Sequence, residues 1–534
     1  MLPSVSSRQL MIERIARAAA TDRRQFLRGC LGLALGAFAS PLLYAADKRL
    51  RFIDHPFKLG VASGVGAHDR VVLWTRLCPD PLHGGGMPEE RVRLRWEVAS
   101  DEGFGDIVRK GDAYAVGELG HSVHAEVDGL APDRPYWYRF FAGDETSPTG
   151  RTRTLPAPDA ANARLRFALA SCQHFEQGYF GAYRHLVRDE PDLMIFVGDY
   201  IYESSWGDDP VREHATPEPH SLLDYRDRHA QYRGDETLQA AHAALPWLVT
   251  VDDHEVDNDW AGDVSEGLDP QFVARRANAL QAYFEHMPLP MSALKKGAAL
   301  SLYRRLDVGR LARIHLLDDR QYRDAHVCAR PGIGGANTVS VRECPALDDP
   351  SRTLLGREQE RWLDEGLRDS RARWNVIAQE TLFSQFKQPQ GGEDRFYSED
   401  WNGYRAARGR LVQSLQKHKI NNALIVGGDV HTSFAADVKA DFDKPDSAIV
   451  ATEFTGTSLT SAGLPQAKID EYLKANPHMH LGNSDEHGYL LFDLAADETR
   501  AKFRVVESIK RRDSPIRTLA EFRAEHGKPG VKPV

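Results

Sequence analysis

The sequence predicts an α/β (α+β) protein in which an N-terminal β-sandwich precedes an α/β sandwich with central sheets flanked by helices. Two patterns support this prediction. Between about residues 55 and 155, short segments alternate apolar with polar residues and are separated by Gly, Pro and Asp, as in strands with one buried face. From Leu165 onward, short apolar runs alternate with segments of helical spacing, which indicates a layered α/β domain.

The N-terminus carries a targeting signal. The twin-arginine motif Asp22–Arg28 precedes an apolar run from Cys30 to Ala45. That run of about sixteen residues is shorter than the roughly twenty that a membrane-spanning helix needs. We therefore predict a twin-arginine signal peptide over residues 1–46, cleaved after Ala39 or Ala45, with no stable membrane span afterwards. The expected partner is the twin-arginine translocase, and the expected location is periplasmic or secreted.

Composition limits the functions that the chain can have. The 534 residues are enough for two domains, and 42% hydrophobic residues supply ample cores. The net charge of −9 argues against a basic, specific nucleic-acid-binding surface. An acidic protein can still bind phosphate where metal ions supply the local positive charge.

The β-rich part is assigned to residues 50–155. Its clearest predicted strands are Arg70–Leu77, Val92–Val98 and Tyr136–Phe140. Short, evenly spaced strands over about a hundred residues are typical of a β-sandwich. The segment Val127–Pro132, before the aromatic strand, resembles a fibronectin type III module.

The second domain is assigned to residues 164–510, followed by a C-terminal segment, 511–534. Leu519–Glu525 in that segment is expected to form a short amphipathic helix. Cys328 and Cys344 flank a Gly-rich loop and are placed to pair in an oxidising compartment, with two reduced thiols as the alternative. The other predicted elements are strands at 165–169, 193–197, 245–251, 312–317, 374–377 and 423–426, and helices at 181–186 and 357–367.

Four of these strands end in residues that can hold a metal ion. The ends are Ser171-Cys172-Gln173-His174, Gly198-Asp199-Tyr200-Ile201-Tyr202, Asp252-Asp253-His254-Glu255 and Gly428-Asp429-Val430-His431. Open α/β sheets bind ligands at the carboxyl ends of their strands, so a metal site is predicted at this edge.

The ligand types indicate which ions this edge would bind. Carboxylates favour hard cations such as Ca²⁺, Mn²⁺ or Mg²⁺, whereas a thiolate with a phenolate suits a more acidic ion such as ferric iron. A mixed set suggests several metals that share a carboxylate, with Asp199 as the shared one. Clustered metals activate water and clamp phosphoryl oxygens, so phosphoester hydrolysis is the predicted chemistry.

These four strand ends, in this order behind a twin-arginine signal and a β-module, resemble the PhoD-like alkaline phosphatases and phosphodiesterases of the calcineurin-like metallophosphoesterase superfamily. The resemblance implies one Fe³⁺ and two Ca²⁺. It makes His254 the residue that donates a proton to the leaving oxygen or stabilises the transition state. Under the resemblance the metal ligands are Cys172, Asp199 (bridging), Tyr202, Asp253, Asp429 and His431.

Two departures from the wider superfamily bear on these assignments. Asp253 stands where an Asn usually precedes the histidine. Asp252 and Asn258 therefore remain alternatives, either as metal ligands or as residues that hold the ligands in place. A separate metal-binding histidine is not evident between these motifs, where the stretch Asn375–Glu380 offers Gln379. Both departures favour the iron–calcium variant over a His-rich dinuclear site.

The function expected from these residues is hydrolysis of phosphomonoesters, phosphodiesters or both for phosphate acquisition. Metal-bound water would attack phosphorus in line. A phospholipase D-like enzyme that acts on phospholipids is the alternative. A remote alternative is an exported, non-enzymatic binding module with structural metals.

Overall fold

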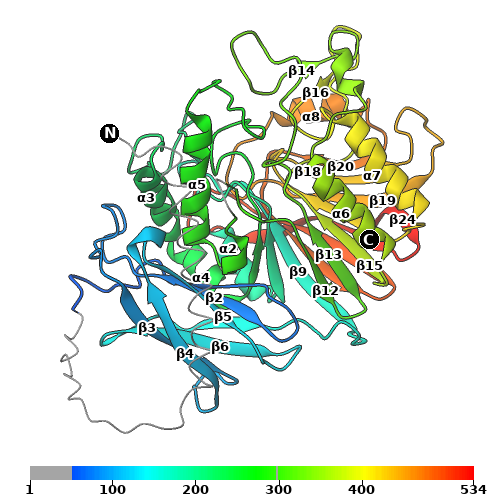
Figure 1. Ribbon diagram of the computed structural model, residues 1–534. Coiled ribbons are helices and arrows are strands. Elements are labelled where there is room, and N and C mark those ends of the chain that lie inside the picture. Colours follow the sequence, from blue (N-terminus) through cyan, green and yellow to red (C-terminus); the bar gives the residue numbers. More distant parts are fainter. Residues whose placement is uncertain (1–50, 296–298) are drawn as a thin grey trace, which may run out of the picture.

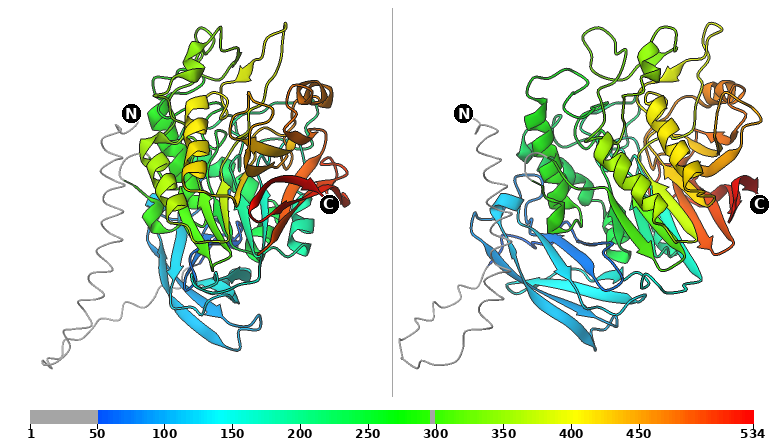
Figure 2. Two further views of the ribbon diagram at one scale, coloured as in Figure 1. Left: turned by 90° about the vertical axis from the view of Figure 1, so that its right-hand side faces the viewer. Right: turned by 45° about the vertical axis from the view of Figure 1, so that its right-hand side comes forward.

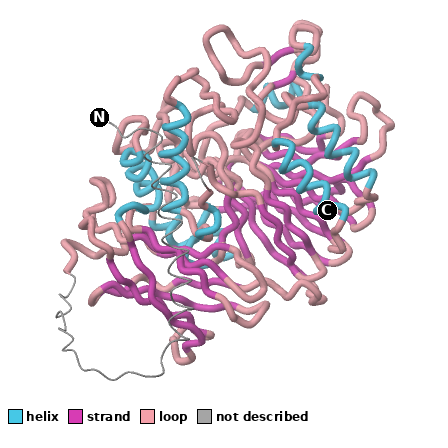
Figure 3. Tube along the Cα trace, in the orientation of Figure 1, coloured by secondary structure: helices cyan, strands magenta, loops and turns pink. Residues whose placement is uncertain are grey.

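The computed structural model describes residues 51–295 and 299–534, and its architecture is mixed α/β (Figure 1). Two large sheets pack face to face, and helices cover the outer face of each (Figure 3). The predicted fold class is confirmed. The twin-arginine motif and its apolar run lie outside the described residues.

The first large sheet has ten strands, and its central strands β9, β10 and β11 are parallel. The predicted strands 165–169 and 193–197 correspond to β9 and β10, whereas the run 245–251 forms only the three-residue β11. The strands, in spatial order, are β24 (Lys528–Pro533), β23 (Ile516–Glu525), β22 (Glu498–Val506), β21 (His487–Ala495), β9 (Arg164–Ala170), β10 (Leu193–Phe196), β11 (Trp247–Val249), β1 (Val61–Gly64), β2 (Val71–Arg76) and β5 (Ser122–Val127).

The second large sheet has seven strands, of which β13, β15, β17 and β19 are parallel. Apolar side chains from both sheets fill the space between them, and Phe454 and Phe492 meet there from opposite sheets. The strands, in spatial order, are β12 (Arg304–Val308), β13 (Ala312–Leu316), β15 (Trp374–Ala378), β17 (Ala423–Gly427), β19 (Ile449–Thr455), β18 (Ser433–Lys439) and β20 (Met479–Asn483).

Helices cover the two outer faces. Helices α2 to α5 pack on the ten-stranded sheet, and α6 and α7 pack on the seven-stranded one (Figure 1). The predicted helices 181–186 and 357–367 correspond to α2 and α6. The bounds are α2 (Ala182–Arg188), α3 (Leu222–Arg233), α4 (Glu236–Ala244), α5 (Phe272–His286), α6 (Gly356–Arg368), α7 (Arg405–Lys417) and α8 (Gln466–Leu473), with 3₁₀ turns η1 (Gly117–Leu119), η2 (Met291–Ala293) and η3 (Pro345–Asp348). Among the described residues, none of these helices combines the length and apolar character of a membrane span.

The N-terminal part forms a sandwich, as predicted, but it shares one sheet with the rest of the chain. Its own sheet consists of β4 (Ile107–Ala115), β3 (Val92–Ala99), β6 (Pro135–Ala142) and β7 (Glu145–Thr146), with β8 (Gly150–Arg153) paired to β6. This sheet packs on β1, β2 and β5. Those three strands continue the ten-stranded sheet, because Gly64 of β1 lies beside Trp247 of β11 in parallel register.

The C-terminal helix predicted over Leu519–Glu525 is wrong, because these residues lie in β23. This strand pairs with β22 on one side and β24 on the other. Phe522 and Ala524 point into the space between the sheets. The end of the chain therefore closes the sandwich (Figure 2), with the Val531 amide donating to Asp437 of β18 at 2.7 Å.

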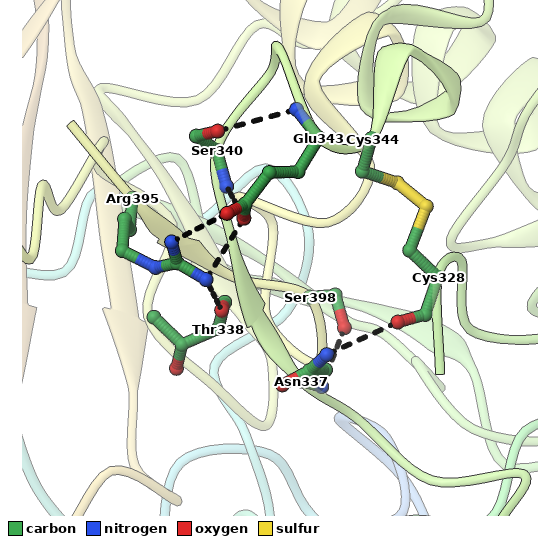
Figure 4. The surroundings of a disulfide bond; sticks show 8 residues. All are labelled: Cys328, Asn337, Thr338, Ser340, Glu343, Cys344, Arg395 and Ser398. Carbon is green, nitrogen blue, oxygen red and sulfur yellow. Dashed lines mark hydrogen bonds and ion pairs between the residues drawn. A yellow bond between two sulfur atoms is a disulfide. The ribbon is translucent and has the colours of Figure 1, made fainter. Parts of the chain in front are cut away.

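Cys328 and Cys344 form the disulfide that the sequence allowed (Figure 4). The bridge ties together the loop that carries β14 (Thr338–Val339), and β14 pairs with β16 (Phe396–Tyr397). Asn337, next to β14, donates to the Cys328 carbonyl at 3.2 Å. The bridge thus braces a loop at the rim of a cavity that Thr338 and Tyr397 line.

Candidate metal centre

The predicted site residues converge where parallel strands of both sheets end. Cys172 follows β9, Asp199 follows β10, Asp253 follows β11 and Asp429 follows β17. The segments that follow β10 and β11 lie so close together that position 198 has no room for a side chain. A Cβ added to Gly198, the residue before Asp199, would lie 2.4 Å from the Asp252 amide nitrogen.

Four candidate ligands have backbones in the left-handed region. The φ angles are 58° at Cys172, 57° at Asp199, 62° at Asp429 and 49° at His431. They are four of the twelve described non-glycine residues with positive φ, although the site holds only a small share of the chain. Each such residue costs about 1–3 kcal/mol, and such strain gathers at functional sites. The local backbone is therefore shaped for the directions of these side chains.

One group of donors combines sulfur, oxygen and nitrogen. Ligand atoms of Cys172, Asp199 and His431 all lie within 4.8 Å of one another. The buried Tyr202 hydroxyl donates to Asp199 Oδ2 at 2.8 Å and lies 3.2 Å from His431 Nε2. A thiol, a phenol, an imidazole and a carboxylate thus lie together, and their deprotonated forms make a donor set that fits ferric iron.

A second group is made of carboxylates. Oxygens of Asp199, Asp252, Asp253 and Asp429 lie within 4.8 Å of one another, and this set fits hard cations such as calcium. The fully buried Arg320 borders the group. Its Nε donates to Asp252 Oδ1 at 2.5 Å, and its Nη2 lies 3.7 Å from Asp253 Oδ1. Asp252 is therefore partly neutralised by Arg320, while Asp199 belongs to both groups.

His254 is held by a buried glutamate. Its Nδ1 lies 2.7 Å from Glu203 Oε2, and its amide donates to Asp199 Oδ1 at 3.3 Å. Burial alone would lower the pKa of His254, but Glu203, Asp253 and Asp199 together raise it well above the usual range. These carboxylates, Glu203 first among them, favour the protonated form of the imidazole.

The electrostatics of the centre show a deficit of positive charge. Burial, with Asp199 and Asp429 nearby, raises the pKa of the Cys172 thiol well above its usual value. Burial, with Asp199 and Cys172 nearby, does the same to the Tyr202 phenol. Burial also raises the pKa of the Asp199 and Asp429 carboxyls. Bound cations would reverse these shifts, so the residues present fit a multinuclear metal site.

A cavity of about 750 Å³ opens above this centre. Asp199, Asp253, His254, Asp429 and His431 line it, whereas Cys172 and Tyr202 are fully buried. A charged centre at the floor of a cavity of this size can bind a phosphoryl group together with an organic substituent.

Two other predicted positions lie at or near the centre. Asn258 lines the cavity, and its side-chain nitrogen Nδ2 donates to Glu266 Oε2 at 3.0 Å. The side chain of Gln379 is bound to other groups. Its Oε1 accepts from the Trp401 indole at 3.0 Å, and its side-chain nitrogen Nε2 donates to the Thr381 carbonyl. Gln379 therefore does not replace the histidine that other metallophosphoesterases have.

A neighbouring group, His174, Glu176 and His214, also brings candidate ligand atoms within 4.8 Å of one another. The Tyr232 hydroxyl accepts two backbone N–H groups, so its own proton goes to His214 Nε2 at 3.1 Å. His214 Nδ1 lies 3.1 Å from Ser205 Oγ and 3.6 Å from Glu176 Oε1. Both ring nitrogens of His214 thus have polar partners, whereas His174 Nε2 is buried without a hydrogen-bond partner among the described residues. The His174 ring packs against Tyr202, with ring centroids 4.4 Å apart.

Sequence reasoning missed Glu203 and Arg320. Glu203 directly follows Tyr202 in a recognised motif but received no role. Arg320 follows the predicted strand 312–317, and β13 ends at the same edge as β17. The position of Arg320 just beyond the end of a parallel strand is the sequence signal for its role.

Comparison with known proteins identifies the family. The family model described as "PhoD-like phosphatase" matches residues 167–503, and the model of its N-terminal domain matches residues 44–156. The chain belongs to the PhoD-like phosphatase family. It is 44% identical to alkaline phosphatase D of Bacillus subtilis (strain 168) over 533 residues, covering 96% of this chain and 89% of the relative.

A solved structure agrees with this family. "Structure of PhoD" matches with a TM-score of 0.86 and 44% identity, covering 91% of this chain and 93% of that chain. The PhoD-like resemblance drawn from the strand ends is confirmed. The chain is thereby placed among the phosphoric ester hydrolases.

Proposed function

We propose that this protein is an exported, metal-dependent hydrolase of phosphomonoesters, phosphodiesters or both, which releases phosphate for uptake. One observation carries the proposal: two donor groups of different chemistry share Asp199 beneath one cavity, next to a histidine held by a buried glutamate. A substrate phosphoryl group would reach the donors and His254 from the same cavity.

The donor sets support one Fe³⁺ and two Ca²⁺. Cys172, Tyr202 and His431 would hold iron with Asp199, and Asp199, Asp253 and Asp429 would hold calcium. When bound, such ions supply an activated water nucleophile and offset charge on the phosphoryl oxygens. Elemental analysis should find one iron and about two calcium ions per chain. Zinc or manganese alone would contradict this assignment.

His254 is proposed to assist the leaving oxygen. Glu203 occupies its Nδ1, so Nε2 is the nitrogen free to donate a proton in the cavity. The hydrogen bond to Glu203 fixes the direction of the ring and favours its charged form.

Replacement of Asp199 tests the proposed function. Because both donor groups include this carboxylate, Asp199→Asn should abolish hydrolysis of nitrophenyl phosphate and of bis(nitrophenyl) phosphate. Asp446→Asn, on an exposed turn outside the cavity, is the matched control and should leave both rates unchanged. An Asp199→Asn variant that keeps most of its activity would sink the proposal.

Export by the twin-arginine route is a separate proposal. It rests on Arg23 and Arg24 and the apolar run behind them. Changing both arginines to lysine should leave the full-length protein inside the cell, measured by fractionation and immunoblotting. Normal export of that variant would show that another signal acts.

A further inference from the structure

Two large apolar side chains are exposed at the mouth of the cavity. Trp206 is 37% exposed and Leu464 is 47% exposed, and both line the cavity that holds the candidate centre. Single exposed apolar residues are common on protein surfaces, but a pair at the mouth of a functional cavity is a candidate contact for a ligand.

Trp206 and the segment Ala462–Leu464 form two rims of the cavity mouth. The buried side chain of Gln177 connects their backbones. The carboxamide nitrogen of Gln177 donates to the Trp206 carbonyl at 3.0 Å, and its oxygen accepts from the Ala462 amide at 2.7 Å. Gln177 is only 6% exposed. Trp206 and the loop Ala462–Leu464 are thus fixed relative to each other, and a mouth fixed in advance lowers the entropic cost of binding.

Both rims lie next to His431, one of the candidate metal ligands. The Trp206 and His431 rings lie parallel, with centroids 6.3 Å apart and planes 7° apart. On the other rim, the Ala462 carbonyl lies 2.7 Å from His431 Nδ1. A Cβ on Gly463 would come within 2.7 Å of the His431 carbonyl oxygen. A phosphoryl group bound at the centre would therefore place its organic substituent within reach of Trp206 and Leu464.

We propose that Trp206 and Leu464 bind the organic group of the substrate, so that the enzyme selects phosphoesters of aromatic or aliphatic alcohols over those of small polar alcohols. The inference rests on the proposed function. Burial of apolar surface drives the contact, and the indole adds stacking with an aromatic ring. Trp206 alone could also attract a cationic group, but Leu464 contributes only apolar area.

Three esters (phenyl phosphate, glycerol phosphate and phosphocholine) and three rim variants test the inference. For Trp206→Ala and Leu464→Ser, kcat/KM should fall about tenfold on phenyl phosphate and less than about twofold on glycerol phosphate. Trp206→Phe should keep most of the selectivity. Leu223→Ser is the matched control, because Leu223 is 50% exposed on α3 and does not line the cavity.

Competitive inhibition separates binding from leaving-group reactivity. The inhibition constant of phenylphosphonate should rise about tenfold in the Trp206→Ala variant, while that of methylphosphonate should stay the same. Equal losses on phenyl phosphate and glycerol phosphate would overturn the inference, because the rim would then be only structural. A loss greatest on phosphocholine would also overturn it, in favour of a cation site. Absence of hydrolysis of all three esters and also of bis(nitrophenyl) phosphate by the wild type would overturn the proposed function instead, and this inference with it.

Discussion

At the scale of single residues, the pair Glu203–His254 determines which proton the centre can move. Glu203 is 2% exposed, so its charge acts on the imidazole with little screening by solvent. A histidine whose pKa is raised remains an acid at the alkaline pH at which a free imidazole has lost its proton. The pair therefore suits protonation of a leaving oxygen in alkaline solution.

Glu203→Gln should lower kcat/KM about tenfold to a hundredfold, because the imidazole loses its orienting carboxylate. It should also move the alkaline limb of the pH profile to lower pH. The sign comes from the charge: Glu203 raises the pKa of His254, so its removal lowers that pKa, and the acid form is lost earlier as pH rises. The measurement is kcat/KM on nitrophenyl phosphate across the alkaline range.

Glu213→Gln, an exposed change outside the cavity, is the matched control. An alkaline limb that stays in place in Glu203→Gln, with activity reduced, would mean that the glutamate is structural and that another group sets the limb.

The same scale shows what could be predicted from the sequence. Cys172, Asp199 and Asp429 were predictable because each lies within three residues of the end of an apolar run, and parallel strands deliver such residues to one edge. The roles of Glu203 and Arg320 depend on partners 51 and 68 residues away, His254 and Asp252, and no local pattern encodes those distances.

At the scale of elements, strand pairing overrode local pattern. Leu519–Glu525 contains residues that favour helices, yet β22 and β24 offer backbone partners on both sides, and alternate side chains enter the core. The buried runs of β9, β10 and β17 were predictable because nearly every side chain in them is apolar and buried.

The packing of α3 on α5 should respond to acid. His229 of α3 stacks on His286 of α5 with ring centroids 4.9 Å apart, and both its ring nitrogens are buried without a hydrogen-bond partner among the described residues. Burial, with the nearby Arg76, Arg233 and Arg228, lowers the pKa of His229 to about 3. The folded protein must therefore keep this ring neutral.

The unfolded chain binds a proton at this position below about pH 6.5, whereas the folded protein does not until about pH 3. Stability should thus fall as pH drops through this window, by at most about 1.4 kcal/mol per pH unit from this group. His229→Leu should flatten the loss, measured by urea unfolding at pH 8, 6 and 5. The exposed His220→Leu is the control, and an equally steep acid loss in both variants would contradict the prediction.

At the scale of the whole molecule, the N-terminal sandwich shares a continuous sheet with the α/β region that carries the metal centre, here called the catalytic layers. Strand β1 lies between β2 of the sandwich and β11 of the catalytic layers. The Trp74 indole of β2 donates to the Glu285 carbonyl of α5 at 3.1 Å. Sequence patterns placed each strand in its own segment, but they carry no information about edges that pair across segments. Two regions joined by backbone hydrogen bonds and shared packing are expected to unfold together.

Calorimetry of the mature protein should therefore show one transition, and a change at the junction should shift all of it. Gly64 is the most informative position to change at this junction, because an added Cβ would lie 2.0 Å from the backbone carbonyl oxygen of Pro288. Gly64→Ala should cost about 1–3 kcal/mol, since a backbone atom cannot move aside as a flexible side chain can. Gly267→Ala, where an added Cβ meets nothing within 4 Å, should leave the transition in place. Two resolved transitions, of which Gly64→Ala moves only one, would show that the shared sheet does not couple the two regions.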